Sequence, residues 1–232
     1  MIEAREPAPE AETHQVIVRH SKSQSDAAHQ VLLGLIVSMR VPPGAHLSEQ
    51  ELTRLSGYGR TPSREALQRL EIEGFCTVLP RRGILVAPLD IRRQTEVWEM
   101  RMELEPVAAR LAAERHSEEE VAQLKVLLAE GYTYLEERQR HFAATAAIDE
   151  RLHLETARAS GNELLINQLT LLYAHAKRQW VYQNRRGWRP DKDIVDEWSA
   201  ILEALQRRDG QASYDLLRAH VANSQIGLAF GF

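Results

Sequence analysis

The stretch that decides the fold runs from Ser48 to Phe75 and reads SEQELTRLSGYGRTPSREALQRLEIEGF. Ser48 and Glu51 form an S-x-x-E capping box, in which each side chain bonds the backbone N–H of the other residue, so a helix begins here. Gly57 ends this helix after about two turns, because glycine readily adopts the left-handed conformation of a helix C-terminus. A second helix is predicted from Thr61, with Pro62 at its first position, to Gly74. Two short helices joined by so tight a turn predict a helix-turn-helix.

Regular elements are expected on both sides of this pair. Upstream, Ser25 is a candidate N-cap, and apolar residues at helical spacing follow it. Downstream, the apolar runs FCTVL and ILVAPL flank PRRG, which predicts a β-hairpin with Arg81 and Arg82 at its tip. Three helices and a hairpin predict a winged helix-turn-helix domain over residues 25–89. Residues 1–24, rich in acidic residues and proline, are expected to form a flexible tail.

Composition limits where anions could bind. The 232 residues carry a formal charge of −4, which argues against a uniformly basic nucleic-acid binder. Residues 1–88 hold 10 basic and 10 acidic side chains, and residues 89–232 hold the remaining 19 and 23. An anion-binding surface must therefore be a local patch. The single cysteine, the absence of a membrane-length apolar run and the acidic N-terminus without a signal-peptide pattern predict a cytoplasmic protein without membrane contact.

Four arginines form such a patch. Arg60 and Arg64 lie at the start of the second helix, where the helix dipole is already positive, and Arg81 and Arg82 lie on the hairpin. This arrangement is unfavourable unless an anion completes it, and a DNA phosphate fits, with guanidinium groups also able to bind guanine edges. Arg64 and Gln68 are one turn apart on the face opposite the apolar residues, where base-reading side chains belong. The alternative is that these arginines are ordinary solvated surface residues.

Residues 90–232 show no strand signal and predict an all-α antiparallel bundle, which makes the fold mostly α. In the first predicted helix, the apolar residues Val97, Met100, Leu104, Val107 and Leu111 are expected to form the inner stripe. The six predicted helices cover residues 90–115, 117–135, 141–160, 163–182, 191–208 and 211–230.

Three residues of this bundle could hold a divalent metal. Asp149 and His153 are four residues apart and share one helix face, and His220 lies on the apolar face of the last helix. One carboxylate and two imidazoles leave coordination positions open for water or a ligand. The alternative is a polar surface pair together with a stacked core histidine. No general base is visible beside the three residues in the sequence, which argues against an enzyme.

The segment SEQELTRLSGYGRTPSREALQRLEIEGFCTVLPRRGILVA resembles the winged-helix DNA-binding domain of the GntR family of bacterial transcription regulators. The family pattern S-R-T-P-x-R places its two arginines at Arg60 and Arg64, and the R-G of the wing at Arg82 and Gly83. The family serine before the first arginine is Gly59 here, so a hydroxyl that could touch phosphate is missing. The resulting set of predicted DNA contacts is Arg60, Thr61, Ser63, Arg64, Gln68, Arg81, Arg82 and Gly83.

Residues 90–232, with EVWEMRMELEPVAARLAAERHSEEEVAQL, IDERLHLETARASGNELL and DEWSAILEALQRRDGQASYDLLRAHVANS, resemble the FCD domain of the FadR subgroup, and six helices indicate its VanR-like branch. Many FCD domains bind a metal, often zinc, through four residues, and Asp149, His153 and His220 match three of these. Trp198 stands where the fourth, a histidine, is usual. The resemblance therefore implies zinc or nickel held by three ligands, a weak site that stays empty, or a purely organic pocket.

The resemblance also implies a ligand, because FCD domains usually sense small carboxylates. A buried cation would then be needed, and Arg101 and Arg178 are the candidates, with a surface position as the alternative for both. Other residues expected to line the cavity are Tyr173, Trp198 and Asn223.

Together these features predict a homodimeric repressor that binds double-stranded operator DNA and responds to a small organic acid. Two alternatives stay open at this point. One is a metal-dependent enzyme using Asp149, His153 and His220, and the other is an architectural DNA-binding protein without an effector.

Overall fold

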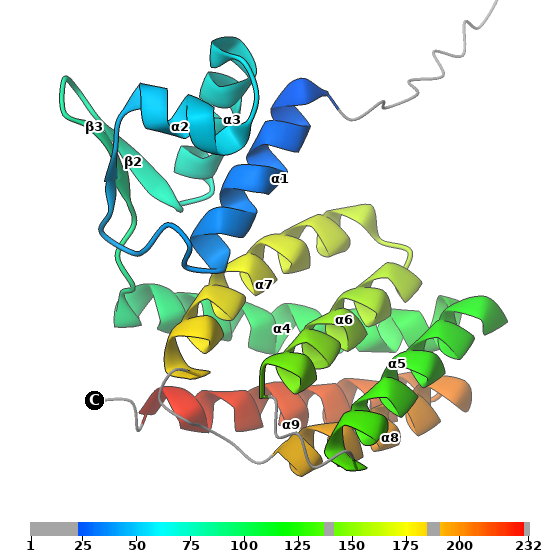
Figure 1. Ribbon diagram of the computed structural model, residues 1–232. Helices are drawn as coiled ribbons and strands as arrows, with labels where there is room; N and C mark the ends of the chain where they lie inside the picture. Colours follow the sequence, from blue (N-terminus) through cyan, green and yellow to red (C-terminus); the bar gives the residue numbers. More distant parts are fainter. Residues whose placement is uncertain (1–22, 137–141, 185–190, 230–232) are drawn as a thin grey trace, which may run out of the picture.

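The computed structural model describes residues 23–136, 142–184 and 191–229 (Figure 1). The N-terminal part is built from α1 (Gln24–Val37), β1 (His46–Leu47), α2 (Glu49–Ser56), α3 (Arg60–Ile72), β2 (Cys76–Leu79) and β3 (Gly83–Val86). The strands form an antiparallel sheet in the order β1-β3-β2. This confirms the winged helix-turn-helix. The sequence analysis did not predict β1, because two residues are too few to show strand alternation. Of the predicted tail, only Ser23 and Gln24 lie among the described residues.

Local capping determines where these helices begin. The capping box of Ser48 and Glu51 is present, and Gly57 ends α2 with a left-handed φ of 75°. The predicted N-cap Ser25 is wrong: Ser23 caps α1 and forms a second capping box with Asp26. Helix α3 begins one residue earlier than predicted, with Gly59 as its N-cap, so Pro62 is its third residue.

The core of the winged domain lies between α1, α3 and the sheet. Side chains at helical spacing on α1 and α3 pack against Phe75 and the inward residues of β3, and together they form a buried apolar cluster. Two residues of a later helix, Leu171 and Ala174, pack against this core. The buried residues of this core include Ala28, Leu32, Ile36, Leu52, Ala66, Leu67, Leu70, Phe75, Cys76, Ile84 and Val86.

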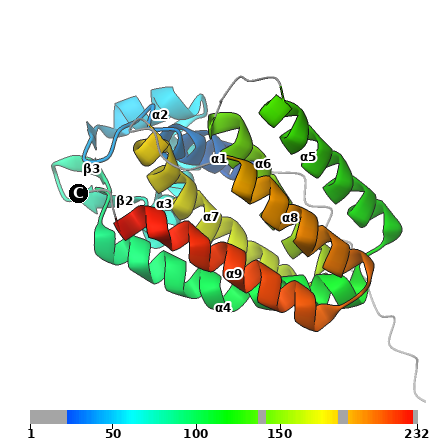
Figure 2. The same cartoon turned by 90° about the horizontal axis from the view of Figure 1, so that it is seen from below.

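The second part of the described chain is an all-helical bundle. Its six helices are α4 (Ile91–Arg115), α5 (Glu118–Glu136), α6 (Phe142–Ala159), α7 (Glu163–Asn184), α8 (Asp191–Gln206) and α9 (Gly210–Ala229). Figure 2 shows α4 and α9 side by side, and α7 crosses beneath α1 in Figure 1. The predicted mostly-α fold with six bundle helices is confirmed within the described ranges. None of the described helices is both long and apolar enough to cross a lipid bilayer.

The inner face of α4 differs from the prediction. Met100, expected inside, is 49% exposed, whereas Arg101 and Glu105 are 3% and 1% exposed. Leu104, Val107 and Leu111 are half-buried and contribute to a second apolar cluster with α6 and α7. The predicted inner stripe of α4 is therefore displaced by about one residue from the observed one. The prediction treated charged side chains as facing water.

Gly83 opens β3 and generates the first prediction. Its φ is 87°, and a Cβ there would lie 2.5 Å from the carbonyl oxygen of Leu47, whereas Gly44, with φ 76°, has open space. We expect Gly44→Ala to lower the free energy of unfolding by about 1 kcal/mol through its left-handed backbone alone. Gly83→Ala should cost about 3 kcal/mol or more, because β1 must also move.

Urea denaturation of both variants measures the difference. Equal losses for Gly83→Ala and Gly44→Ala would show that the wing tolerates a Cβ beside Leu47.

Candidate functional site

The start of α3 is an open, positively polarised end. Gly59 caps it without a side-chain hydrogen bond, and no acidic residue lies in the first turn. Pro62 has no N–H and Ser63 N donates to Gly59 O, so the backbone N–H groups of Arg60 and Thr61 lack helical partners. The side chains of Arg60, Thr61, Arg64 and Gln68 are all exposed around this end. The surface therefore offers two backbone donors and two guanidinium groups to an anion.

One of these arginines has an acidic neighbour. Nη2 of Arg64 lies 3.0 Å from both carboxylate oxygens of Glu49, the first residue of α2. Both side chains are more than half exposed, so water screens this pair and a phosphate or base edge can replace it. No ion pair joins Arg60, Arg81 or Arg82 to a carboxylate within the described part of the chain.

The wing presents Arg81 and Arg82 at the tip between β2 and β3, where both side chains are exposed. Arg81 has a positive φ of 61°, and Arg82 N donates to Leu79 O across the turn. Gly83 is half-buried against Leu47, so the wing needs it for its backbone conformation, whatever DNA contact it makes.

Ser63 is a correction to the predicted DNA contacts. It is 0% exposed, and its hydroxyl lies 2.7 Å from Oγ of Ser56 and 2.8 Å from the carbonyl oxygen of Gly59. The hydroxyl therefore joins the end of α2 to the start of α3. Its role is to hold the turn of the helix-turn-helix, and the side chain is not available to DNA.

The three predicted metal ligands meet inside the bundle. Nε2 of His153 is 3.1 Å from Nε2 of His220. Oδ1 of Asp149 lies 3.2 Å from Nε2 of His220 and 3.6 Å from Nε2 of His153. Tetrahedral bonds of 2.0–2.2 Å separate neighbouring ligand atoms by about 3.4 Å, so this triangle of one oxygen and two nitrogens fits a divalent metal such as zinc.

A second carboxylate backs each histidine on the side away from this triangle. Nδ1 of His153 lies 2.5 Å from Oε2 of Glu105, and Nδ1 of His220 lies 2.6 Å from Oε2 of Glu197. A carboxylate hydrogen-bonded in this position orients a histidine ligand and raises its basicity, as Glu197 does for His220. Nδ1 of His153 is close to Glu105 but is not aligned for a hydrogen bond. Neither was predicted: the sequence showed no general base beside the three residues, whereas the structure brings these two carboxylates next to the imidazoles. Both carboxylates, however, are engaged with imidazole nitrogens.

Trp198 lies beside the triangle, as its position in the sequence indicates. It is 1% exposed, and its indole N–H donates to Oδ1 of Asp149 at 2.7 Å. The ring also meets His153 edge-on, with centroids 4.7 Å apart. Trp198 thus orients the carboxylate of Asp149 in place of supplying a metal-binding nitrogen.

Arg101 links this interior to a cleft. Its Nε donates to Oε1 of Glu105 at 2.5 Å, and its Nη2 donates to the hydroxyl of Tyr173 at 2.8 Å. That hydroxyl donates in turn to Oε2 of Glu105 at 2.7 Å. Nη1 has no hydrogen bond to a described residue. Glu105 therefore links the guanidinium of Arg101 to His153, one of the three candidate metal ligands.

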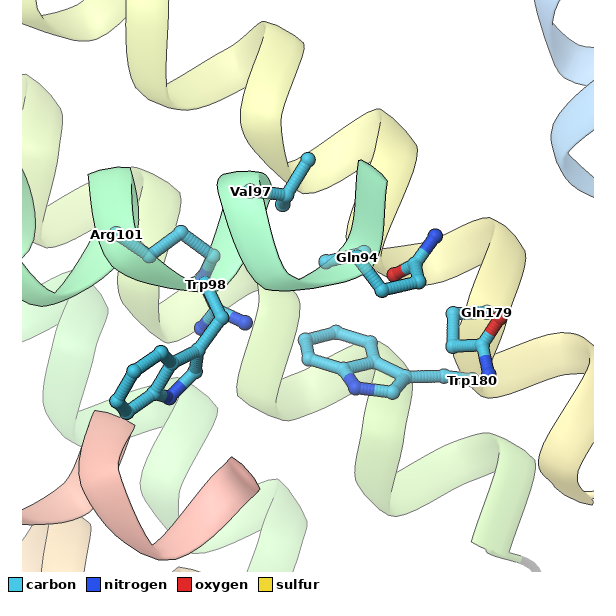
Figure 3. Close-up of a pocket in the computed structure, with 7 residues that line it drawn as sticks. Gln94, Val97, Trp98, Arg101, Gln179 and Trp180 are labelled. Carbon is cyan, nitrogen blue, oxygen red and sulfur yellow. The ribbon is translucent and has the colours of Figure 1, made fainter. Parts of the chain in front are cut away.

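The cleft lies between α4 and α7. Figure 3 shows Arg101 reaching between the indoles of Trp98 and Trp180, and its Cζ is 5.2 Å from the ring centre of Trp180. The space of about 20 Å³ holds about one water molecule, so a larger ligand requires the walls to separate. Its remaining walls are Gln94, Val97, Ala176 and Gln179.

Of the five predicted effector residues, only Arg101 lines this cleft. Tyr173 and Trp198 lie beside the buried cluster, and the other two lie elsewhere. Arg178 is buried on another face of α7 and donates from Nη2 to Ala87 O in the segment that joins the wing to α4. Asn223 is exposed and donates to Oε1 of Glu197 at 2.7 Å. Arg178 does not line the cleft between α4 and α7, because α7 directs it toward the winged domain.

Burial and neighbouring charges set the protonation of the cluster. Burial alone would raise the pKa of Glu105, but Arg101 and His153 outweigh it and hold the pKa at about 2. Burial lowers the pKa of His153 despite Glu105 and Asp149, so this ring is neutral. Burial would also lower the pKa of His220, yet hydrogen bonds to Asp149 and Glu197 raise it to about 9.

The imidazolium of His220 lies between two carboxylates, those of Asp149 and Glu197. A divalent cation at the three donor atoms would take the place of the Nε2 proton of His220. The donor geometry therefore fits a metal.

Comparison with known proteins assigns both parts of the chain. Residues 24–86 match the bacterial regulatory proteins of the gntR family, and residues 96–223 match the FCD domain. The chain is a GntR-family regulator with an FCD domain. An Nta operon transcriptional regulator of Aminobacter aminovorans is 31% identical over 154 residues, which are 66% of this chain and 72% of the relative.

Two further relatives of the GntR regulator span nearly the whole chain. The transcriptional repressor RspR of Escherichia coli K12 is 25% identical over 193 residues, 83% of each chain. The solved structure of E. coli McbR/YncC aligns with a TM-score of 0.75 and 22% identity, covering 89% of this chain and 98% of that one. This last likeness concerns the fold alone. The arginine surface falls in the gntR match and the buried cluster in the FCD match, and both matches point to a regulator and away from an enzyme.

The imidazole of His220 in the FCD domain provides the second prediction. In metal-free protein an NMR titration should give it a pKa of about 9. Because this folded-state value exceeds the ordinary value of about 6.5, its contribution to stability is fully present below about pH 6.5 and is lost as the pH rises through about 9.

Glu197→Gln should move this pKa toward the ordinary value. The variant should therefore be less stable than the wild type at about pH 6, and the gap should narrow at about pH 10. A wild-type pKa close to the ordinary value, or a gap independent of pH, would contradict the assigned ion pairs.

Proposed function

We propose that this protein is a cytoplasmic, homodimeric repressor that binds operator DNA through α3 and the wing, and releases it when a small carboxylate binds in the FCD domain beside a divalent metal. The observation that carries the proposal is the contrast between the two sites. Arginines are left largely unpaired at the start of α3, whereas the bundle buries a connected network of charged groups. Binding of DNA phosphates would explain the unpaired arginines at the start of α3. Binding of a ligand would explain the buried charges of the bundle.

The DNA contacts follow from the start of α3. Placing it in the major groove brings Arg64 and Gln68 to base edges and the backbone N–H groups of Arg60 and Thr61 to a phosphate. Arg81 and Arg82 on the wing would then contact the DNA phosphate backbone beside that groove. A dimer would read two half-sites about one DNA turn, ~34 Å, apart or somewhat less.

Arg64→Ala should weaken operator binding about tenfold and blur the preference at one base pair, because a bidentate base contact is lost. Binding curves on operator and scrambled duplexes measure both effects. The operator is first selected from random DNA with the wild type.

Arg69→Ala is the matched control, since Arg69 lies on the same helix but pairs with Asp26 of α1 at 2.5 Å. It should bind close to wild type. Equal operator affinity for Arg64→Ala and the wild type would remove Arg64 from the reading surface.

The sensory role rests on the path from the cleft to the metal triangle. A carboxylate that enters between Trp98 and Trp180 meets Nη1 of Arg101, and Glu105 connects Arg101 to His153. Asp149, His153 and His220 would hold the metal, which supplies a Lewis-acidic partner for a ligand oxygen. An architectural DNA-binding protein would have no need to bury this network in place of apolar side chains.

Metal and carboxylate binding are tested together. Elemental analysis of the purified protein should find about one divalent metal per chain, which His153→Ala removes and the exposed control His46→Ala retains. In thermal-shift assays with zinc or nickel, members of a panel of small carboxylates should raise the melting temperature of the wild type. The same members should not stabilise His153→Ala.

The role of Arg101 needs a paired variant. Removing it alone leaves Glu105 as an uncompensated buried charge, which would cost about 3–5 kcal/mol and obscure the result. Arg101→Met combined with Glu105→Gln avoids this and should abolish the carboxylate shift. A metal-free wild type that still responds to a carboxylate would overturn the metal part of the proposal.

A further inference from the structure

Helix α7 contacts both halves of the molecule. On one side Tyr173 bonds Arg101 of α4, and Ala176 lines the cleft. On another side Leu171 and Ala174 join the apolar core of the winged domain, beneath α1 in Figure 1. His175 lies between these two pairs of contacts and is 7% exposed. The residue next to the cleft therefore contacts the DNA-reading domain.

His175 holds the C-terminal end of α3. Its ring stacks on Phe75 with centroids 4.1 Å apart and planes inclined by 9°. Its Nε2 lies 2.9 Å from the backbone carbonyl of Glu73, the C-cap of α3. A carbonyl only accepts, so Nε2 carries the proton. Burial lowers the pKa of His175, which keeps the ring neutral and the stacked arrangement in place at neutral pH.

Other contacts hold the same joint, by which we mean the packing of the C-terminal end of α3 against α1 and α7. The carboxylate of Glu73 binds Nε2 of His29 on α1 at 2.6 Å. A Cβ on Gly74 would lie 3.9 Å from Cε1 of His175 and 3.7 Å from Nη2 of Arg93, so side chains pack directly over this turn. The end of α3 is thus held from α1 on one side and from α7 on the other.

Arg178, nearly one turn beyond His175, holds the exit of the wing. It is 3% exposed, donates from Nη2 to Ala87 O, and its Nε has no partner among the described residues. Burial lowers its pKa to about 10. A buried cation with so few partners is costly to folding, so its position is better explained by fixing the connection between domains than by stability.

This joint lies at the opposite end of α3 from the DNA contacts of Arg60, Thr61 and Arg64. Helix α3 has 13 residues, so its two ends are about 20 Å apart. A rotation of about 10° at His175 would move the DNA-contacting end by roughly 3.4 Å, the rise of one base pair. Small changes at the joint therefore become base-pair-sized changes at the DNA.

We propose that His175, supported by Arg178, is a positioning residue that fixes the direction of α3 relative to the bundle and thereby sets the half-site spacing that the dimer accepts. The inference rests on the proposed operator binding. It assigns spacing selectivity to the joint, and sequence reading within each half-site to Arg64 and Gln68.

The test uses the full-length protein and the operator selected with the wild type. Duplexes with one or two base pairs added to or removed from the spacer are compared with the original. The wild type should lose about tenfold in affinity per one-base-pair change, the scale of a lost base contact. His175→Leu and Arg178→Met should bind the whole series within a few-fold, while a duplex with one half-site binds them as it binds the wild type.

His116→Leu is the matched control. His116 is also 7% exposed and its Nε2 also lies 2.9 Å from a backbone carbonyl, that of Leu205, but inside the bundle. It should lose similar stability, followed by thermal melting, and keep the wild-type spacing preference.

The outcomes separate the two proposals. Unchanged spacing selectivity in both joint variants, equal relaxation in His116→Leu, or a wild type indifferent to spacing overturns the role of His175. A wild type that selects no DNA sequence overturns operator binding, and the inference falls with it. If His175→Leu does not fold, Arg178→Met and His175→Gln carry the same comparison.

Discussion

The buried carboxylate of Glu105 is the group on which the interior of the bundle depends. It accepts hydrogen bonds from Arg101 and Tyr173 and lies against Nδ1 of His153. Without it, Arg101 would be an uncompensated buried cation, and His153 would lose the carboxylate nearest to its Nδ1. Glu105 therefore connects the cleft and the guanidinium of Arg101 to the three candidate metal ligands.

The two candidate sites differ in how their positive charges are compensated. Inside the bundle, every cation of the cluster has a carboxylate within hydrogen-bonding distance, because an unpaired charge away from water is strongly unfavourable. At the start of α3, water screens the guanidinium groups, so leaving them almost unpaired costs little. Such a surface can remain unpaired until an external polyanion binds. The buried charges, in contrast, must be paired within the folded protein itself.

Sequence reasoning succeeded where signals are local. The capping box at Ser48 and the left-handed Gly57 are short-range effects, and the helix-turn-helix follows from them. It failed where packing decides. Glu105 looks like a surface acid on any helical wheel, and only the partners brought by α6 and α7 explain its burial. Arg101 and Arg178 look equivalent in sequence, yet the direction of each helix face places one in the bundle interior and the other at the domain joint.

The same reasoning explains why α7 joins the two sites. A ligand can alter operator affinity only through a difference in its affinity for two arrangements of the protein. The cleft has room for about one water molecule, so α4 and α7 would have to separate before any carboxylate could reach Arg101. Ala176 in the cleft wall is bonded directly to His175, which is stacked on Phe75 at the end of α3. Under the proposed function, a separation of α4 and α7 would therefore act directly on the residue that holds the end of α3.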